Sequence, residues 1–189
     1  METSQIKFPG QFNESSVKNN SGKNKIANIK IIGVGGAGTN AVNRMVMAGI
    51  SDVQLYAVNT DMGSLKKSSA DTKISIGTGL GVGGDPEKGK KYAEDSIDKF
   101  REMLQGSDMI FITTGMGGGT GTGAAPVIAR VAREMDLELQ KLEKPGILII
   151  GVVTKPFSAE GSERISNANK GIAELREYTD ALIVIPNDR

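Results

Sequence analysis

Short apolar runs alternate along the chain with segments whose apolar residues recur every three or four positions. The runs are rich in β-branched residues, and several are apolar on both faces, which is typical of strands buried in a parallel sheet. They span 28–34, 53–59, 108–114, 147–154 and 181–185, with a weaker one at 73–76. The βα order predicts an α/β fold with an open, mainly parallel, Rossmann-like sheet and helices on both faces.

Helical periodicity fills most of the spaces between these strands. A helix with Asp85 as N-cap and Pro86 at its first position is expected to run on to Leu104. The other helices are expected to follow residue 38 and to span 124–135, with Pro126 in the first turn, and 161–179. The glycine cluster at 77–84 is predicted to be a mobile loop, and the charged stretch 136–146 a surface connection.

The N-terminal segment differs from the rest in composition. Residues 1–25 are polar, carry no apolar period and are predicted to be a disordered tail, which leaves 26–189 as one domain. No apolar run is long enough to cross a membrane or to form a signal peptide, so a cytoplasmic location is expected.

Composition removes several classes of chemistry. The chain has no cysteine and no histidine, which excludes disulfides, thiol catalysis, imidazole bases and ordinary zinc sites. The formal net charge of +1 is dispersed, with few aromatic residues, so no nucleic-acid partner is expected.

The most informative segment is the glycine run 115–123, Gly-Met-Gly-Gly-Gly-Thr-Gly-Thr-Gly. It joins a predicted buried strand to a predicted helix, so its free N–H groups and the helix dipole are expected to face a ligand there. Glycine allows a phosphate to approach the backbone closely, and Thr120 and Thr122 add hydroxyl donors. A flexible linker is the alternative, but a linker has no need of a flanking strand and helix.

A second strand, glycine turn and helix occurs at residues 28–46. Gly33, Gly35 and Gly38 match G-x-G-x-x-G, and Asp61 lies about 20 positions further on, as a dinucleotide site requires. This pattern alone suits an NAD- or FAD-dependent oxidoreductase equally well, and that alternative stays open.

Polar residues near other predicted strand ends complete a candidate crevice. Ligands of such sheets bind at the C-terminal ends of the strands, where both glycine turns lie. Glu160 and Arg164 lie four apart and share a helix face, where they form either a solvated ion pair or a ribose and phosphate contact. Asn40 and Asn187 are candidate readers of a purine edge, or simple cap and turn residues.

Several motifs, in this order, resemble the FtsZ branch of the tubulin superfamily. They are Gly33-Val-Gly-Gly-Ala-Gly-Thr-Asn-Ala-Val-Asn-Arg44, Val58-Asn-Thr-Asp61, the glycine run extended to Pro126, Val152-Val-Thr-Lys-Pro-Phe157, Glu160-Gly161 with Arg164, and Leu182-Ile-Val-Ile-Pro-Asn-Asp-Arg189. The resemblance covers about residue 28 to the end.

The resemblance implies a domain that binds GTP or GDP, with Mg²⁺ accompanying the nucleotide. It also implies a GTPase that polymerises head to tail into the division ring at mid-cell, together with division proteins. The implied nucleotide-binding residues are Gly35, Gly36, Ala37, Gly38, Thr39, Asn40, Arg44, Gly115, Gly117, Gly118, Gly119, Thr120, Gly121, Thr154, Pro156, Glu160, Arg164 and Asn187. Substituting Gly119 or Thr120 by alanine is expected to weaken binding and leave the fold largely intact.

The sequence departs from the family pattern in three respects. Thr39 stands where the family has Asn, and the 136–146 connection is longer than usual. The resemblance implies a second domain that carries a guanine-binding Asp, an aromatic cover for the base and an acidic Asn-x-Asp-x-x-Asp loop that activates water, and this domain is expected to be absent. No catalytic residue and no metal ligand are therefore assigned in this chain, which is expected to bind nucleotide and to hydrolyse it poorly. A GTP-binding interaction module without turnover remains an alternative.

Overall fold

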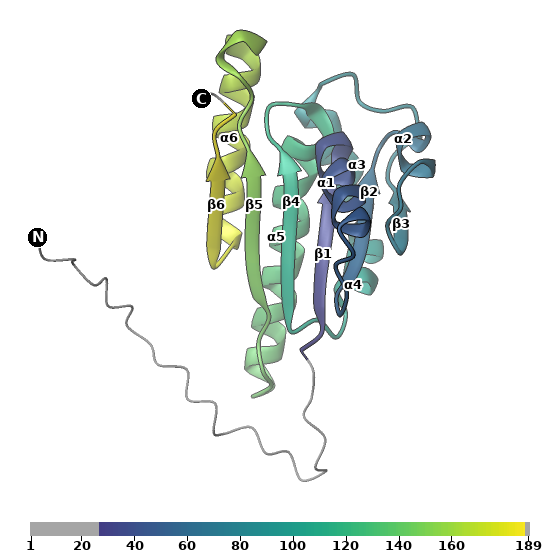
Figure 1. Cartoon of the computed structure of the whole chain (residues 1–189). Coiled ribbons are helices and arrows are strands. Elements are labelled where there is room, and N and C mark those ends of the chain that lie inside the picture. The colour runs from purple at the N-terminus through teal and green to yellow at the C-terminus, as the bar shows by residue number, and fades with distance from the viewer. Residues whose placement is uncertain (1–26, 188–189) are drawn as a thin grey trace, which may run out of the picture.

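The computed structural model describes residues 27–187, so the predicted tail at 1–25 lies outside the described residues. Its centre is a six-stranded, entirely parallel sheet in the order β3-β2-β1-β4-β5-β6 (Figure 1). The strands are β1 (Ile29–Val34), β2 (Gln54–Asn59), β3 (Thr72–Ser75), β4 (Met109–Gly115), β5 (Leu148–Thr154) and β6 (Ala181–Ile185). All six predicted strands are confirmed.

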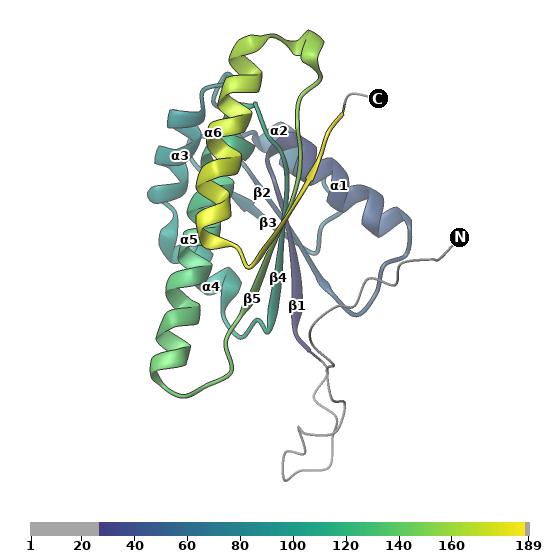
Figure 2. The ribbon, with the colours of Figure 1, turned by 90° about the vertical axis from the view of Figure 1, so that its left-hand side faces the viewer.

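Helices cover both faces of this sheet, as predicted. The helix α1 (Gly35–Met47) lies on one face and α5 (Gly119–Lys141) and α6 (Ser162–Tyr178) on the other (Figure 2). The short α2 (Met62–Lys66) shares a buried cluster with α1, and α3 (Pro86–Glu94) and α4 (Ile97–Leu104) pack beside α5.

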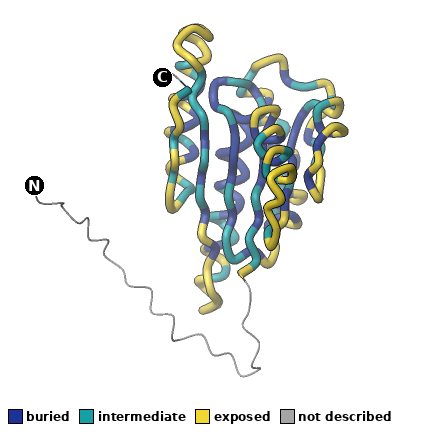
Figure 3. Tube along the Cα trace, viewed as in Figure 1, coloured by how far each residue is buried: buried dark blue, intermediate teal, exposed yellow. Residues whose placement is uncertain are grey.

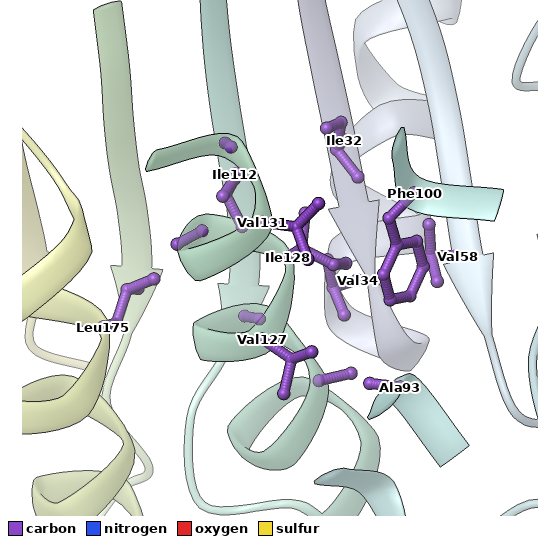
Figure 4. Packing of buried hydrophobic residues seen from close by; sticks show 14 of the residues in the cluster. Ile32, Val34, Val58, Ala93, Phe100, Ile112, Val127, Ile128, Val131 and Leu175 are labelled. Carbon is purple, nitrogen blue, oxygen red and sulfur yellow. The ribbon is translucent and has the colours of Figure 1, made fainter. Parts of the chain in front are cut away.

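The larger core lies between the sheet and α5 (Figures 3 and 4). Ile32 and Val34 of β1 and Ile112 of β4 face Val127 and Ile128 of α5, and all are essentially inaccessible. Burying each such side chain contributes about 1.5–3 kcal/mol, so this layer holds the C-terminal strand ends in fixed relation to α5.

The structure has two helices where the sequence predicted one. The expected helix from Pro86 to Leu104 breaks at Asp95 and Ser96, where α3 ends and α4 begins. Asp85 does cap α3, since its carboxylate accepts from the N–H groups of Glu87 and Lys88. The break brings both Ala93 and Phe100 into the core at 0% exposure.

The helix predicted at 124–135 is longer at both ends. It begins at Gly119, so Pro126 lies inside the helix and not in its first turn. Gly123 permits the early start, because a Cβ there would lie 2.1 Å from the Pro86 carbonyl oxygen of α3.

The helix also continues to Lys141, so most of the predicted connection 136–146 is helical. Asp136 is buried, and its carboxylate accepts from Ile147 N at 2.7 Å, Gln140 Nε2 at 2.8 Å and Arg133 at 2.9 Å. The prediction of a surface connection is therefore wrong for Asp136, whose carboxylate is an internal acceptor for the backbone N–H just before β5.

The sheet face on the α1 side stays open over β5 and β6. Leu148, Ile183 and Ile185 point to this face and are 42%, 53% and 44% exposed. Parallel strands are normally covered on both faces, so this apolar area is unusual. None of the helices within residues 27–187 combines the length and apolarity needed to cross a bilayer.

Candidate functional site

A crevice of about 340 Å³ lies at the C-terminal ends of β1, β4, β5 and β6. Four segments distant in sequence meet there, as the sequence predicted. Its lining includes thirteen of the predicted residues: Gly35, Gly36, Ala37, Gly115, Gly118, Gly119, Thr120, Gly121, Thr154, Pro156, Glu160, Arg164 and Asn187.

The N-terminus of α5 forms one wall. Gly118 is the N-cap, and Gly119, Thr120 and Gly121 make the first turn, whose N–H groups have no partner within the helix. A helix of 23 residues adds the positive end of its dipole at the same place. This wall therefore favours an anion.

Glycine is required here for close packing. A Cβ on Gly121 would lie 2.1 Å from Thr114 Oγ1, and one on Gly119 would lie 2.8 Å from the backbone of Gly84 and of Asp85. Gly118 and Gly36, by contrast, would have no atom within 4 Å of an added Cβ. The space beside these two glycines is open.

The turn from β1 to α1 forms an adjoining wall, since a Cβ on Gly35 would lie 3.0 Å from Gly121 N. Gly35 has φ +69°, a left-handed conformation that glycine adopts without strain, and Gly36 and Ala37 line the crevice. Gly38 serves packing instead, because a Cβ there would lie 2.4 Å from Thr113 O. Of the three glycines of the G-x-G-x-x-G pattern, only Gly35 lines the crevice, whereas Gly33 and Gly38 are needed for close packing.

Five of the predicted residues, Gly38, Thr39, Asn40, Arg44 and Gly117, do not line the crevice. The Thr39 hydroxyl is buried and donates to Gly35 O at 2.8 Å, so it is already engaged within α1. Gly117 N–H donates to Thr122 Oγ1 at 2.8 Å. Asn40 and Arg44 are exposed on α1, one helical turn apart.

The loop after β5 contributes the charged groups. Glu160 ends the 3₁₀ helix Ser158–Glu160 and forms an ion pair with Arg164 in the first turn of α6. Glu160 also accepts from Phe157 N at 2.9 Å, which fixes the loop. Both the ion-pair and the ligand-binding interpretations of the sequence fit this geometry, since the pair lies in the crevice wall.

Val34, Met116 and Lys155 also line the crevice and were not predicted. Lys155 stands between two predicted residues, Thr154 and Pro156, and its cationic side chain in a proposed phosphate site was a usable signal. Val34 and Met116 are apolar and buried, and only their places inside the two glycine motifs could have indicated that they line the crevice.

The third glycine cluster is a loop, as predicted, and backbone hydrogen bonds anchor it beside the crevice. Met62 N donates to Gly79 O and Gly81 N to Thr60 O, each at 2.9 Å. Asp61 is not a crevice residue. It caps α2, and hydrogen bonds from the Ser64 hydroxyl and Gly63 N–H lower the pKa of its carboxyl. The carboxylate that kept the dinucleotide interpretation open is therefore used for capping.

The crevice presents backbone donors, a helix N-terminus and hydroxyls, which together suit a phosphate group. Among residues 27–187 no group of three or more carboxylates is placed to hold a metal ion.

Comparison with known proteins gives one family and several similar structures. The model of "Tubulin/FtsZ family, GTPase domain" matches residues 28–189. An FtsZ dimer from M. jannaschii is 44% identical, with TM-score 0.78, over 85% of this chain and 45% of that chain. CetZ1 from Haloferax volcanii, a GDP-bound monomer, is 29% identical, with TM-score 0.70, over 85% and 51%.

CetZ2 from the same organism, described as a GTPγS-bound protofilament, is 28% identical, with TM-score 0.68, over 85% of this chain and 49% of that one. This chain therefore spans about half the length of these structures.

Proposed function

The chain belongs to the tubulin/FtsZ family through its GTPase domain, and from that premise we propose that its crevice binds GTP and GDP. The observation that carries the proposal is the convergence of two glycine turns on one crevice, where the first turn of α5 and the β1–α1 turn adjoin each other. Two such walls suit a polyphosphate with a nucleoside attached, and Glu160, Arg164 and Asn187 supply polar groups for the sugar and base.

The proposed role of each predicted residue follows from its position. Gly35 to Ala37 and Gly118 to Gly121 hold the phosphates through backbone N–H groups. Thr154 and Pro156 flank the sugar. Asn40 and Arg44, which lie on α1 outside the crevice lining, would contact only a base that extends beyond it. Mg²⁺ bound with the nucleotide would neutralise part of the phosphate charge.

We further propose that this domain serves an FtsZ-like GTPase. Such a protein would assemble head to tail in the cytoplasm at the division site. The 44% identity to FtsZ and the protofilament form of CetZ2 support this. The isolated chain is proposed to hydrolyse GTP poorly. Among the described residues that line the crevice, Glu160 is the one carboxylate, and it is already engaged by Arg164 and by Phe157 N–H.

Equilibrium titration with labelled GTP, GDP, ATP and NADH tests this function. A site that hydrogen-bonds a guanine edge disfavours adenine because its own polar groups then go unpaired. We expect GTP and GDP to bind more tightly than ATP, and NADH to bind most weakly. Tighter NADH binding would replace the proposal with the oxidoreductase alternative.

A further inference from the structure

Two threonine hydroxyls from segments distant in sequence meet beside the crevice. Thr60 follows β2, and Thr120 is in the first turn of α5. Their Oγ1 atoms lie 2.7 Å apart, and the distance alone lets either hydroxyl donate. Thr120 lines the crevice, whereas Thr60 does not.

Burial decides which hydroxyl donates. Thr60 is 1% exposed, and within residues 27–187 its hydroxyl hydrogen-bonds to no other group than Thr120. If Thr120 donated, the Thr60 hydrogen would be buried without an acceptor, at a cost of about 1–3 kcal/mol. If Thr60 donates, both hydroxyls are satisfied, because the Thr120 hydrogen is left for the crevice.

We propose that Thr60 is a positioning residue that makes the Thr120 hydroxyl a donor toward a phosphate oxygen in the crevice. The inference rests on the proposed nucleotide-binding function and adds to it. A hydroxyl whose oxygen already accepts presents its hydrogen to the ligand, so an acceptor is favoured there. A phosphate oxygen is such an acceptor, and it lies beside the N–H groups of the same helical turn.

The backbone holds Thr60 in place independently of its hydroxyl. Its carbonyl accepts from Gly81 N at 2.9 Å, and its neighbour Asn59 belongs to β2 and accepts from Ile76 N at 3.1 Å. Replacing the hydroxyl with a methyl group therefore removes the donor and keeps the shape and the main-chain bonds.

The test compares Thr60→Val, Thr60→Ser, Thr120→Val and the double valine variant, with GDP and guanosine as probes. Thr60→Val is expected to weaken GDP binding about three- to tenfold, the range for one hydrogen bond, and Thr60→Ser to restore it. Guanosine has no phosphate, so its affinity is expected not to change. In the Thr120→Val background, Thr60→Val is expected to add nothing, because the two residues act through one bond.

Thr179→Val is the matched control, since it removes a hydroxyl that donates to Leu175 O at the opposite end of the sheet. Equal losses for GDP and guanosine, or additive effects of the two valines, would overturn the proposal. If Thr60→Val fails to fold, NMR of the hydroxyl protons in wild-type chain decides, and a hydrogen carried by Thr120 toward Thr60 would refute it. Failure of wild-type chain to bind GDP would instead count against the proposed function.

Discussion

Asp136 Oδ1 accepts a 2.7 Å hydrogen bond from the backbone N–H of Ile147, which joins α5 to the start of β5. The carboxylate is 2% exposed and also accepts from Arg133 and Gln140. A buried carboxylate with three donors holds the long helix to the sheet at the end opposite the crevice.

Asp136→Ala is expected to lower the free energy of unfolding by about 3 kcal/mol, because it leaves the Ile147 N–H buried without an acceptor. Asp136→Asn keeps an acceptor oxygen and is expected to cost less. Urea unfolding measures both, with the exposed carboxylate variant Glu177→Ala as control. A loss for Asp136→Ala no greater than that of the control would contradict this role.

Asp136 also shows the limit of the sequence prediction. Its neighbours are charged, so the pattern indicated a surface connection, and only the packing of α5 against β5 reveals an internal partner. The strands were predicted well because continuous apolar runs are a local signal, and they remain so in β5 and β6, whose second face is open. The crevice was predicted because strand ends of a parallel sheet meet at one edge.

The roles of single glycines and threonines could not be predicted in this way. Thr39 and Gly117 belong to matching motifs, yet their polar groups are already engaged by Gly35 O and by Thr122. Such short-range competition for hydrogen bonds depends on side-chain positions that spacing does not encode.

Gly118 tests the proposed phosphate contact of the first α5 turn more directly than Gly119 does. Gly118→Ala is expected to retain the wild-type unfolding free energy, since no atom lies within 4 Å of its added Cβ. The methyl group is expected to obstruct the N–H groups of the α5 turn and to lower GDP affinity about tenfold or more, equivalent to one charge-assisted hydrogen bond. Calorimetric titration checks the affinity, and an unchanged value would show that the phosphates lie elsewhere.

Gly119→Ala is expected to lower stability, whereas the sequence alone predicted that this substitution would leave the fold largely intact. Its Cβ would lie 2.5 Å from Val82 Cγ2 and 2.8 Å from Asp85 N, and backbone cannot yield cheaply. Overpacking of this kind costs about 1–3 kcal/mol. Urea unfolding is expected to show that loss, and equal stability of Gly118→Ala and Gly119→Ala would contradict the packing argument.

The Asp61 carboxylate gives stability a dependence on acid pH. Its pKa is lowered by the Ser64 hydroxyl and Gly63 N–H, so its contribution is present above the unfolded value of about 3.9 and lost as pH falls through the folded value. In Asp61→Asn the urea midpoint is expected to fall less steeply with decreasing pH, below about pH 4, than in the wild type. If the urea midpoints of Asp61→Asn and of the wild type fell in parallel with pH, this contribution of Asp61 would be excluded.

The open sheet face over β5 and β6 makes a separate prediction about self-association. Ile183→Glu is expected to reduce both aggregation and the binding of a dye that recognises exposed apolar surface. Little stability should be lost, because Ile183 is 53% exposed. Ile149→Glu, on the buried face of β5, is the control and is expected to prevent folding. Sedimentation velocity would contradict the prediction if Ile183→Glu self-associated as wild type does.

The last prediction concerns turnover. Hydrolysis of a phosphoanhydride needs a positioned water and stabilised charge. The crevice offers donors to phosphate, but Glu160, the one carboxylate that lines it within residues 27–187, is paired with Arg164. The resemblance to FtsZ places the water-activating acidic loop in the second half of the family's chain. Purified chain with GTP and Mg²⁺ is therefore expected to release phosphate at close to the uncatalysed rate.

Adding a polypeptide that carries that second half is expected to produce phosphate release. The specific rate is expected to rise with protein concentration, because the proposed head-to-tail assembly would form one site from two subunits. Gly118→Ala, mixed with the same second half, is the matched control and is expected to release phosphate more slowly at GTP concentrations below saturation, because it binds the nucleotide more weakly. Robust release by the chain alone, independent of concentration, would mean that the catalytic groups lie within these 189 residues. The acidic loop would then not be the source of the activated water.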